Sequence, residues 1–163
     1  MKLEAFLITG IILCIIIVSA CISDEDYFQT KHFENEDISF DYPENWKVTV
    51  TQDPADIPDA NWMIVIGDNE LISGQNENDI RIFEFEPNSI VNSSLVDNSS
   101  GNQIDSIKID NINALGISEK DYKMYIFSKN NMTYQVLVYV TENNGFVEHK
   151  SQFDSILNSI HIK

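Results

Sequence analysis

The chain has 163 residues, of which 43% are hydrophobic and 22% are charged, and its formal net charge is -16. This length fits one domain. The aliphatic and aromatic content is sufficient for a hydrophobic core and argues against a wholly disordered chain. With 10 lysine and arginine residues against 26 aspartate and glutamate residues, the chain has too few cations to neutralise a phosphate backbone. We therefore expect a folded acidic domain that does not bind nucleic acid.

The N-terminus has the pattern of an export signal. A lysine at position 2 precedes an almost wholly apolar run from Ala5 to Ala20, which is shorter than the ~20 residues that span a bilayer as a helix. The run ends in Val18-Ser19-Ala20-Cys21, which resembles a lipobox: an aliphatic residue, two small residues and a cysteine. In signals of this kind the cysteine receives a diacylglyceryl group and becomes the first mature residue. The pattern therefore predicts lipidation at Cys21.

A lipid at Cys21 would place the protein on the outer face of the cytoplasmic membrane. Each buried CH2 contributes roughly 0.8 kcal/mol, so two acyl chains anchor durably where one chain is marginal. The alternative is an uncleaved signal anchor from Ala5 to Ile22, which also places the body outside the cytoplasm. Cys14 lies within the signal, so processing would leave Cys21 alone, with no internal disulfide and no cysteine-based site in the body.

Three segments are predicted along the chain. Residues 1–20 form the lipoprotein signal peptide, residues 21–31 an acidic tether, and residues 32–163 the folded domain. The tether includes Asp24, Glu25 and Asp26 and shows no apolar period. Its negative charges would keep the body away from an anionic lipid surface.

The first part of the domain predicts strands. Apolar and polar residues alternate from Ile38 to Tyr42, and again from Trp46 to Thr51 after a turn that starts at Pro43. A loop with two prolines follows from Asp53 to Ala60. The segment from Trp62 to Ile66 is apolar on both faces, as in an interior strand that is covered on both sides.

The middle of the domain predicts a further strand and then a soft segment. In Ile80 to Phe85 the phase of the apolar residues changes, which indicates either a bulge near Ile82 or a strand with two apolar faces. The segment from Asn88 to Gln103 is rich in serine and asparagine, and it predicts a short helix before a loop.

The last part predicts two hairpins and a helix. Asp110-Asn111 is a turn signal between short strands, and Asn130-Asn131 closes a longer hairpin of Tyr122–Ser128 and Tyr134–Thr141. A stripe at helical spacing then predicts a C-terminal helix, with the apolar residues Phe153, Ile156, Leu157 and Ile160. Together these elements predict an α+β domain in which a helix packs on an antiparallel sheet.

Two patterns resemble the PsbP-like family. One is the strand and turn Ile38-Ser39-Phe40-Asp41-Tyr42-Pro43-Glu44-Asn45-Trp46, and the other is the closing helix from Phe153 to Ile160. The long hairpin between them has its counterpart in that family. The resemblance implies a central antiparallel sheet flanked by helices, an α/β/α sandwich. It also implies a non-enzymatic accessory or binding protein of the prokaryotic exported lipoprotein type.

Catalytic motifs are missing from the sequence. The three histidines are His32, His149 and His161, and only His32 has a carboxylate, Glu36, at helical pair spacing. The sequence has no nucleophile elbow, no His-Glu-x-x-His and no phosphate loop. We therefore expect that the protein is not an enzyme.

Acidic residues do not have the spacing of a calcium-binding loop. The nearest groupings are Asp53, Asp56 and Asp59, the run Asp68-Asn69-Glu70, and the segment Asp97 to Asp105. None matches the alternating carboxylates with a closing glutamate that bind calcium in helix-loop-helix sites. We expect a diffuse acidic surface, and we predict no metal site and no cofactor.

Three Asn-x-Ser/Thr sequons, at Asn92, Asn98 and Asn131, fall in predicted loops or turns. They are possible glycosylation sites in a host that glycosylates exported proteins.

The leading hypothesis is a lipid-anchored extracytoplasmic accessory or binding protein with an envelope protein as its partner. The alternative is a carrier of a small molecule or of Ca²⁺ that uses a pocket between sheet and helix. A third hypothesis, an enzyme, would require His32 or His149 to meet carboxylates in a cleft.

Overall fold

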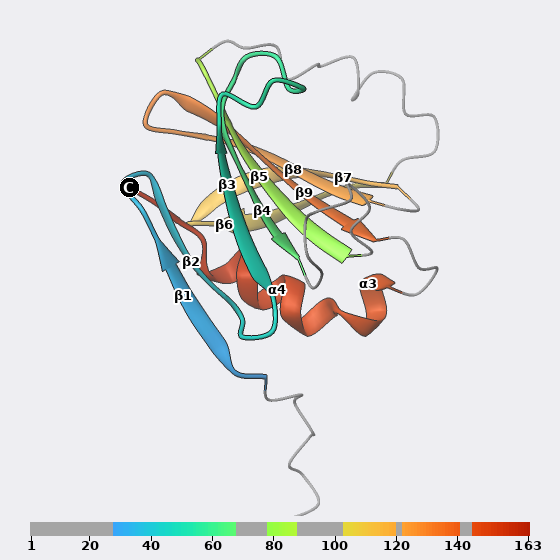
Figure 1. Cartoon of the computed structure of the whole chain (residues 1–163). Coiled ribbons are helices and arrows are strands. Elements are labelled where there is room, and N and C mark those ends of the chain that lie inside the picture. Colours follow the sequence, from blue (N-terminus) through green and yellow to red (C-terminus); the bar gives the residue numbers. More distant parts are fainter. Residues whose placement is uncertain (1–27, 68–77, 88–102, 120–121, 141–144) are drawn as a thin grey trace, which may run out of the picture.

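A three-stranded antiparallel sheet opens the fold in the computed structural model, which describes residues 28–67, 78–87, 103–119, 122–140 and 145–163 (Figure 1). Its strands are β1 (Thr30–Glu34), β2 (Ile38–Pro43) and β10 (His161–Ile162), in the order β1-β2-β10. Ile38 and Phe40 are fully buried and Ser39 between them is half-buried, which confirms the predicted alternation there, while Tyr42 is half-buried like Asp41. β1 begins within the segment predicted as a tether, because Thr30 pairs with Pro43. The proposed signal lies outside the described residues.

A seven-stranded antiparallel sheet forms the main body of the fold, in the order β3-β4-β5-β9-β8-β7-β6. The strands are β3 (Lys47–Gln52), β4 (Ala60–Gly67), β5 (Asn78–Phe85), β6 (Gln103–Ile109), β7 (Ile112–Ser118), β8 (Tyr122–Lys129) and β9 (Met132–Val140). The interior strand predicted at Trp62 to Ile66 is confirmed as part of β4.

β5 is a strand with two apolar faces. Its pairing with β9 is regular from Asn78 to Phe85. The one register shift between β5 and β4 lies at Ala60 and Trp62, away from Ile82. Of the two explanations for the changing phase, the structure therefore supports the two-faced strand and not the bulge at Ile82.

Two asparagine-containing turns close the hairpins. Asp110 and Asn111 have φ values of 51° and 61°, and Asn130 and Asn131 have φ values of 53° and 65°. Two consecutive residues with positive φ make the turn whose twist matches that of the flanking strands. Both predicted hairpins are confirmed: β6 with β7, and β8 with β9.

The helices lie on one face of the large sheet (Figure 1). They are α3 (Gly145–Glu148) and α4 (Lys150–Ser159), and α4 buries Phe153, Ile156 and Leu157. α4 also packs against β2, where Ser159 Oγ accepts a hydrogen bond of 2.8 Å from the backbone N–H of Asp41. The predicted C-terminal helix is confirmed.

The expected flanking of one sheet by helices on both faces is wrong for the described residues. The turn from Pro43 to Trp46, with Trp46 N–H donating to Pro43 C=O at 2.9 Å, leads the chain out of the small sheet and into the large one. The small sheet therefore packs beside α4 as a separate element. The α+β class is confirmed, with a large sheet, two helices on one of its faces and a small sheet, in place of an α/β/α sandwich.

The opposite face of the large sheet carries a second apolar cluster. Ala60, Phe83 and Phe85 are buried there and contact the half-buried Met63 and Leu137. Among the described residues, no helix has the length and apolar character needed to cross a membrane.

A buried hydrogen-bonded group joins three strands of the large sheet. The carboxylate of Glu84, which is 9% exposed, accepts hydrogen bonds from Tyr134 Oη at 2.8 Å and from Asn61 Nδ2 at 3.1 Å. Burial and the contact with Glu84 raise the pKa of Tyr134, so its hydroxyl remains a donor.

Tyr134→Phe is expected to lower the free energy of unfolding by about 1–2 kcal/mol, because one buried oxygen of Glu84 loses its donor. Urea unfolding measures the change. Tyr139→Phe on the same strand is the control, since Tyr139 is half-buried, and its effect should stay within about 0.5 kcal/mol. Equal effects of the two substitutions would contradict the role of the hydrogen bond.

Candidate functional site

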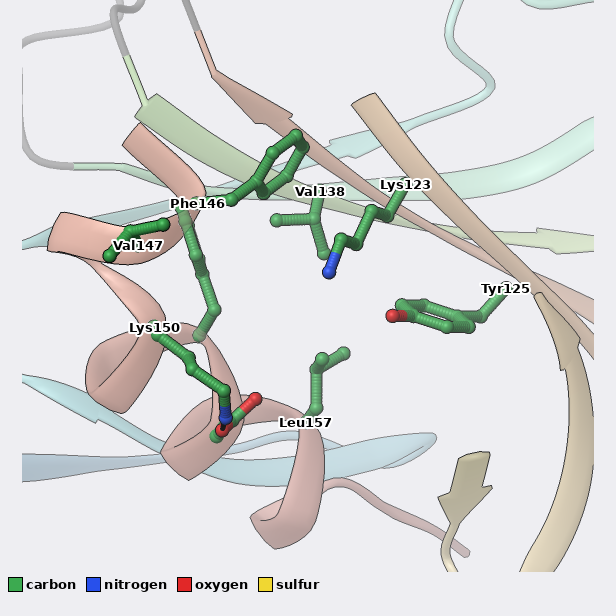
Figure 2. Close-up of a pocket in the computed structure, with 9 residues that line it drawn as sticks. Lys123, Tyr125, Val138, Phe146, Val147, Lys150 and Leu157 are labelled. Atoms are coloured by element: carbon green, nitrogen blue, oxygen red, sulfur yellow. Dashed lines mark hydrogen bonds and ion pairs between the residues drawn. The ribbon is translucent and has the colours of Figure 1, made fainter. Parts of the chain in front are cut away.

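A cavity of about 230 Å³ lies between the two helices and strands β8 and β9 (Figure 2). The residues that line it come from one face of the sheet and from the facing side of α3 and α4: Lys123, Tyr125, Val138, Phe146, Val147, Lys150, Phe153, Asp154 and Leu157. Most of the wall is apolar, and its polar groups belong to Lys123, Tyr125, Lys150 and Asp154. Concave sites of this composition bind small molecules.

The sheet supplies two polar side chains to the cavity. Lys123 and Tyr125 are two positions apart in β8, so both side chains emerge on the face that meets the helices. Val138 is the cross-strand partner of Lys123 and continues the wall on β9. The alternation of β8 thus places an ammonium group and a phenol hydroxyl in the wall of the same cavity.

The helices supply the opposite wall. Phe146 of α3 and Phe153 of α4 lie with their ring centroids 6.4 Å apart. Lys150 forms an ion pair with Asp154 one turn further along α4, at the rim of the cavity. That pairing neutralises the two charged groups of the helix side.

Lys123 is a cation without a carboxylate partner among the described residues. Its Nζ lies 5.0 Å from the ring centroid of Phe146 and points into the cavity (Figure 2). A cation over the face of an aromatic ring is attracted by the ring quadrupole. The ring has no oxygen, however, that could accept a hydrogen bond from the ammonium group. The Lys123 ammonium can therefore donate to a group in the cavity.

The Tyr125 hydroxyl also points into the cavity (Figure 2). Tyr125 is 4% exposed, and burial, followed by the negative charges of Asp105 and Asp154, raises its pKa to about 12. The hydroxyl is therefore neutral at ordinary pH and acts as a hydrogen-bond donor. The cavity can enclose an apolar group and present a charged and a neutral donor to an acceptor.

The histidines do not assemble into a site. Nδ1 of His32 lies 2.7 Å from Asp41 on the neighbouring strand, not at Glu36, and His32 is exposed. Nε2 of His149 lies 3.3 Å from Asn78 Nδ2. The third histidine, His161, contacts Asp110 at 2.9 Å. None of the three lines the cavity.

The described carboxylates of the predicted groupings are not among the residues that line the cavity. Asp53 and Asp59 line an open hollow of about 380 Å³ together with Glu86. Within the described ranges, no three His, Cys, Asp or Glu side chains are close enough to hold a metal ion. The run from Asp68 to Glu70 and the part of the Asp97–Asp105 segment before residue 103 lie outside the described residues.

One of the predicted modification sites falls in a described segment. Asn131 is exposed in the turn between β8 and β9, with φ at 65°. Cys21, Asn92 and Asn98 lie outside the described residues. Lipidation and glycosylation remain predictions.

No sequence motif marks the residues around the cavity. Lys123 and Tyr125 match no motif, and Lys150 and Asp154 show only the spacing of an exposed helical ion pair. The one signal is the position of Lys123 on the face of the hairpin that also carries Tyr125 and Phe127. The pocket between sheet and helix was expected, without its residues.

Known proteins resemble this chain in structure and not in sequence. No protein-family model matches the sequence, and no curated protein matches it. The structure is similar to the solution structure of cyanobacterial PsbP, CyanoP, from Synechocystis sp. PCC 6803. The TM-score is 0.53 at 12% identity, over 86% of this chain and 96% of that one. The chain has a PsbP-like fold, so the predicted resemblance is confirmed for the fold.

Two further structures are similar. One is a protein from Bacteroides thetaiotaomicron with a TM-score of 0.47 and 11% identity, matched over 77% of this chain and 45% of that one. This chain thus spans less than half of that protein. The other is LpqN, a protein involved in cell envelope biogenesis of Mycobacterium tuberculosis. Its TM-score is 0.46 at 13% identity, over 84% of this chain and 92% of that one.

Proposed function

We propose that this chain is a lipid-anchored extracytoplasmic accessory or binding protein. It binds an envelope protein as its partner and is not an enzyme. The observation that carries the proposal is a PsbP-like fold placed directly after a predicted lipoprotein signal. The family resemblance in the sequence supports the same class of protein. The negative charge of -16 favours a soluble body held above the membrane.

Cys21→Ser is expected to abolish lipidation and to leave residues 1–20 uncleaved, because the thiol is the acceptor of the lipid. Intact-mass spectrometry of the chain purified from membranes measures both changes. Cys14→Ser is the matched control and should be processed like the wild type. A wild-type chain that retains residues 1–20 without a lipid would support the signal anchor and contradict lipidation.

In-cell crosslinking of a tagged full chain tests the accessory role. The proposal expects one recurrent envelope protein in amounts comparable to the chain itself, identified by mass spectrometry after purification from membranes. Residues 1–31 fused to an unrelated exported domain serve as the control, which should not capture that protein. A lipidated chain with no partner above this control would contradict the accessory role.

A carrier of a small molecule is the second candidate function. The specific observation in its favour is the cavity between helices and sheet, with the unpaired Lys123 in its wall. Binding of Ca²⁺ in this cavity is not favoured, because the Lys123 ammonium points into it.

A further inference from the structure

We propose that the cavity binds a small amphipathic monocarboxylate, with the carboxylate against Lys123 and Tyr125 and the apolar body against Val138, Phe146 and Leu157. This inference rests on the carrier candidate and not on the envelope partner. It specifies the chemical class of the ligand.

The donor pair selects an acceptor. A lysine ammonium has only donors, and the Tyr125 hydroxyl is kept protonated by its surroundings. Both groups point into the same cavity (Figure 2). A carboxylate is negatively charged and has only acceptors, so it is the group that complements two donors in the wall of one cavity. Charge-assisted hydrogen bonds of this kind are about twice as strong as neutral ones.

The charges around the donors limit the ligand to one negative charge. Asp154 forms an ion pair with Lys150, so this pair adds little net charge to the rim. Asp105 of β6 and Tyr125 of β8 both lie against Gly116 of β7, and the buried Oδ1 of Asp105 has no hydrogen-bond partner among the described residues. Its charge opposes further negative charge near the hydroxyl. A monocarboxylate is therefore favoured over a dianion such as phosphate.

The walls and the size limit the rest of the ligand. Val138, Phe146 and Leu157 offer an apolar surface that would bury a hydrocarbon or aromatic group. The volume of about 230 Å³ is below the ~300–1,000 Å³ of pockets for drug-sized ligands. Hexanoate and phenylacetate are therefore suitable probes.

The test uses the full chain, labelled at its valine and leucine methyl groups, purified from membranes and placed in phosphatidylcholine nanodiscs. Each probe is titrated into this sample while the methyl NMR signals are followed. Hexanoate and phenylacetate should shift the methyl signals of Val138 and Leu157 and give a saturable binding curve. Hexan-1-ol and hexylamine keep the chain length but remove or invert the charge, and each should bind at least about tenfold more weakly. Empty nanodiscs correct for partition into lipid.

Substitutions in the cavity wall test where the carboxylate of the ligand binds. Lys123→Met keeps the length of the side chain and should weaken hexanoate binding about tenfold, and Tyr125→Phe should weaken it about threefold. Lys108→Met makes the same change at an exposed position of β6 outside the cavity and should bind hexanoate like the wild type. Thermal unfolding shows that each variant is folded. If Lys123→Met does not fold, Tyr125→Phe decides the location.

Equal affinity for hexan-1-ol and hexanoate, no shift at Val138 and Leu157, or equal weakening by Lys108→Met and Lys123→Met would each overturn the inference. These outcomes leave the envelope-partner proposal untouched, because crosslinking tests it separately. Hexanoate binding in a chain that captures no partner would instead support the carrier and remove the accessory role.

Discussion

Phe153→Ala is expected to lower the free energy of unfolding by about 3–5 kcal/mol, the loss typical of a buried aromatic side chain in a core. Phe153 is 4% exposed and lies where α4, α3 and the start of β3 meet. Its ring centroid is 5.8 Å from that of Trp46, in an edge-on arrangement, and it also contacts Phe146 and His149. Removal of the ring would enlarge the cavity beside it and release the helix from the sheet.

Urea unfolding measures the loss through the midpoint and the slope of the transition. Asn158→Ala on the exposed side of the same helix is the matched control and should change the free energy of unfolding by no more than about 0.5 kcal/mol. A loss below about 1 kcal/mol for Phe153→Ala would contradict its place at the centre of the core.

Asp110→Asn is expected to lower the free energy of unfolding by about 2–3 kcal/mol at neutral pH, because it removes the charge at the centre of a partly buried network. Oδ2 of Asp110 accepts from Lys129 Nζ at 2.5 Å and from the backbone N–H of Ile162 at 2.9 Å. Lys129 also donates to Ile162 C=O at 2.5 Å. The network therefore joins the β6–β7 turn, β8 and the C-terminal strand β10.

This contribution should disappear in acid. Burial acts to raise the pKa of Asp110, but the hydrogen bonds from Lys129, Ile162 and His161 outweigh it and leave the pKa below its ordinary value. A lowered pKa stabilises the folded state fully above the unfolded value of about 3.9, and the gain is lost as the pH falls through the folded value. The difference between wild type and Asp110→Asn should therefore shrink below about pH 4.

Urea midpoints between pH 7 and the acid limit of folding measure this dependence. Asp154→Asn breaks the more exposed pair with Lys150 and should change the free energy of unfolding by less than about 0.5 kcal/mol. A difference between wild type and Asp110→Asn that stays constant with pH would show that the charge of Asp110 does not stabilise the fold.

Several elements were predictable from the chain alone because their causes are local. The alternation from Ile38 to Tyr42 specifies one buried face of β2, and the stripe from Phe153 specifies the buried side of α4. The pairs Asp110-Asn111 and Asn130-Asn131 tolerate positive φ, which is what their turns require. In each case the deciding interactions lie within a few residues.

Membership of a sheet was not predictable in the same way. β2 and β3 are separated by a short turn, yet they belong to different sheets. The two-residue strand β10 was not predicted, because its pairing partners Ile38 and Ser39 lie more than a hundred residues earlier in the chain. Such pairings depend on the packing of α4, which no local pattern describes.

The sequence by itself determined an acidic α+β domain of PsbP-like type, its hairpins and its closing helix, and it predicted an exported lipoprotein. Only the tertiary structure decided that both described helices share one face and that Lys123 and Tyr125 meet Lys150 and Phe146 around a cavity. Periodicity and turn preference act between neighbours in the chain and so can be read from it. The cavity forms where two hairpin strands meet two helices. The positions of these four elements depend on the packing of the whole core, which involves residues far apart in the chain.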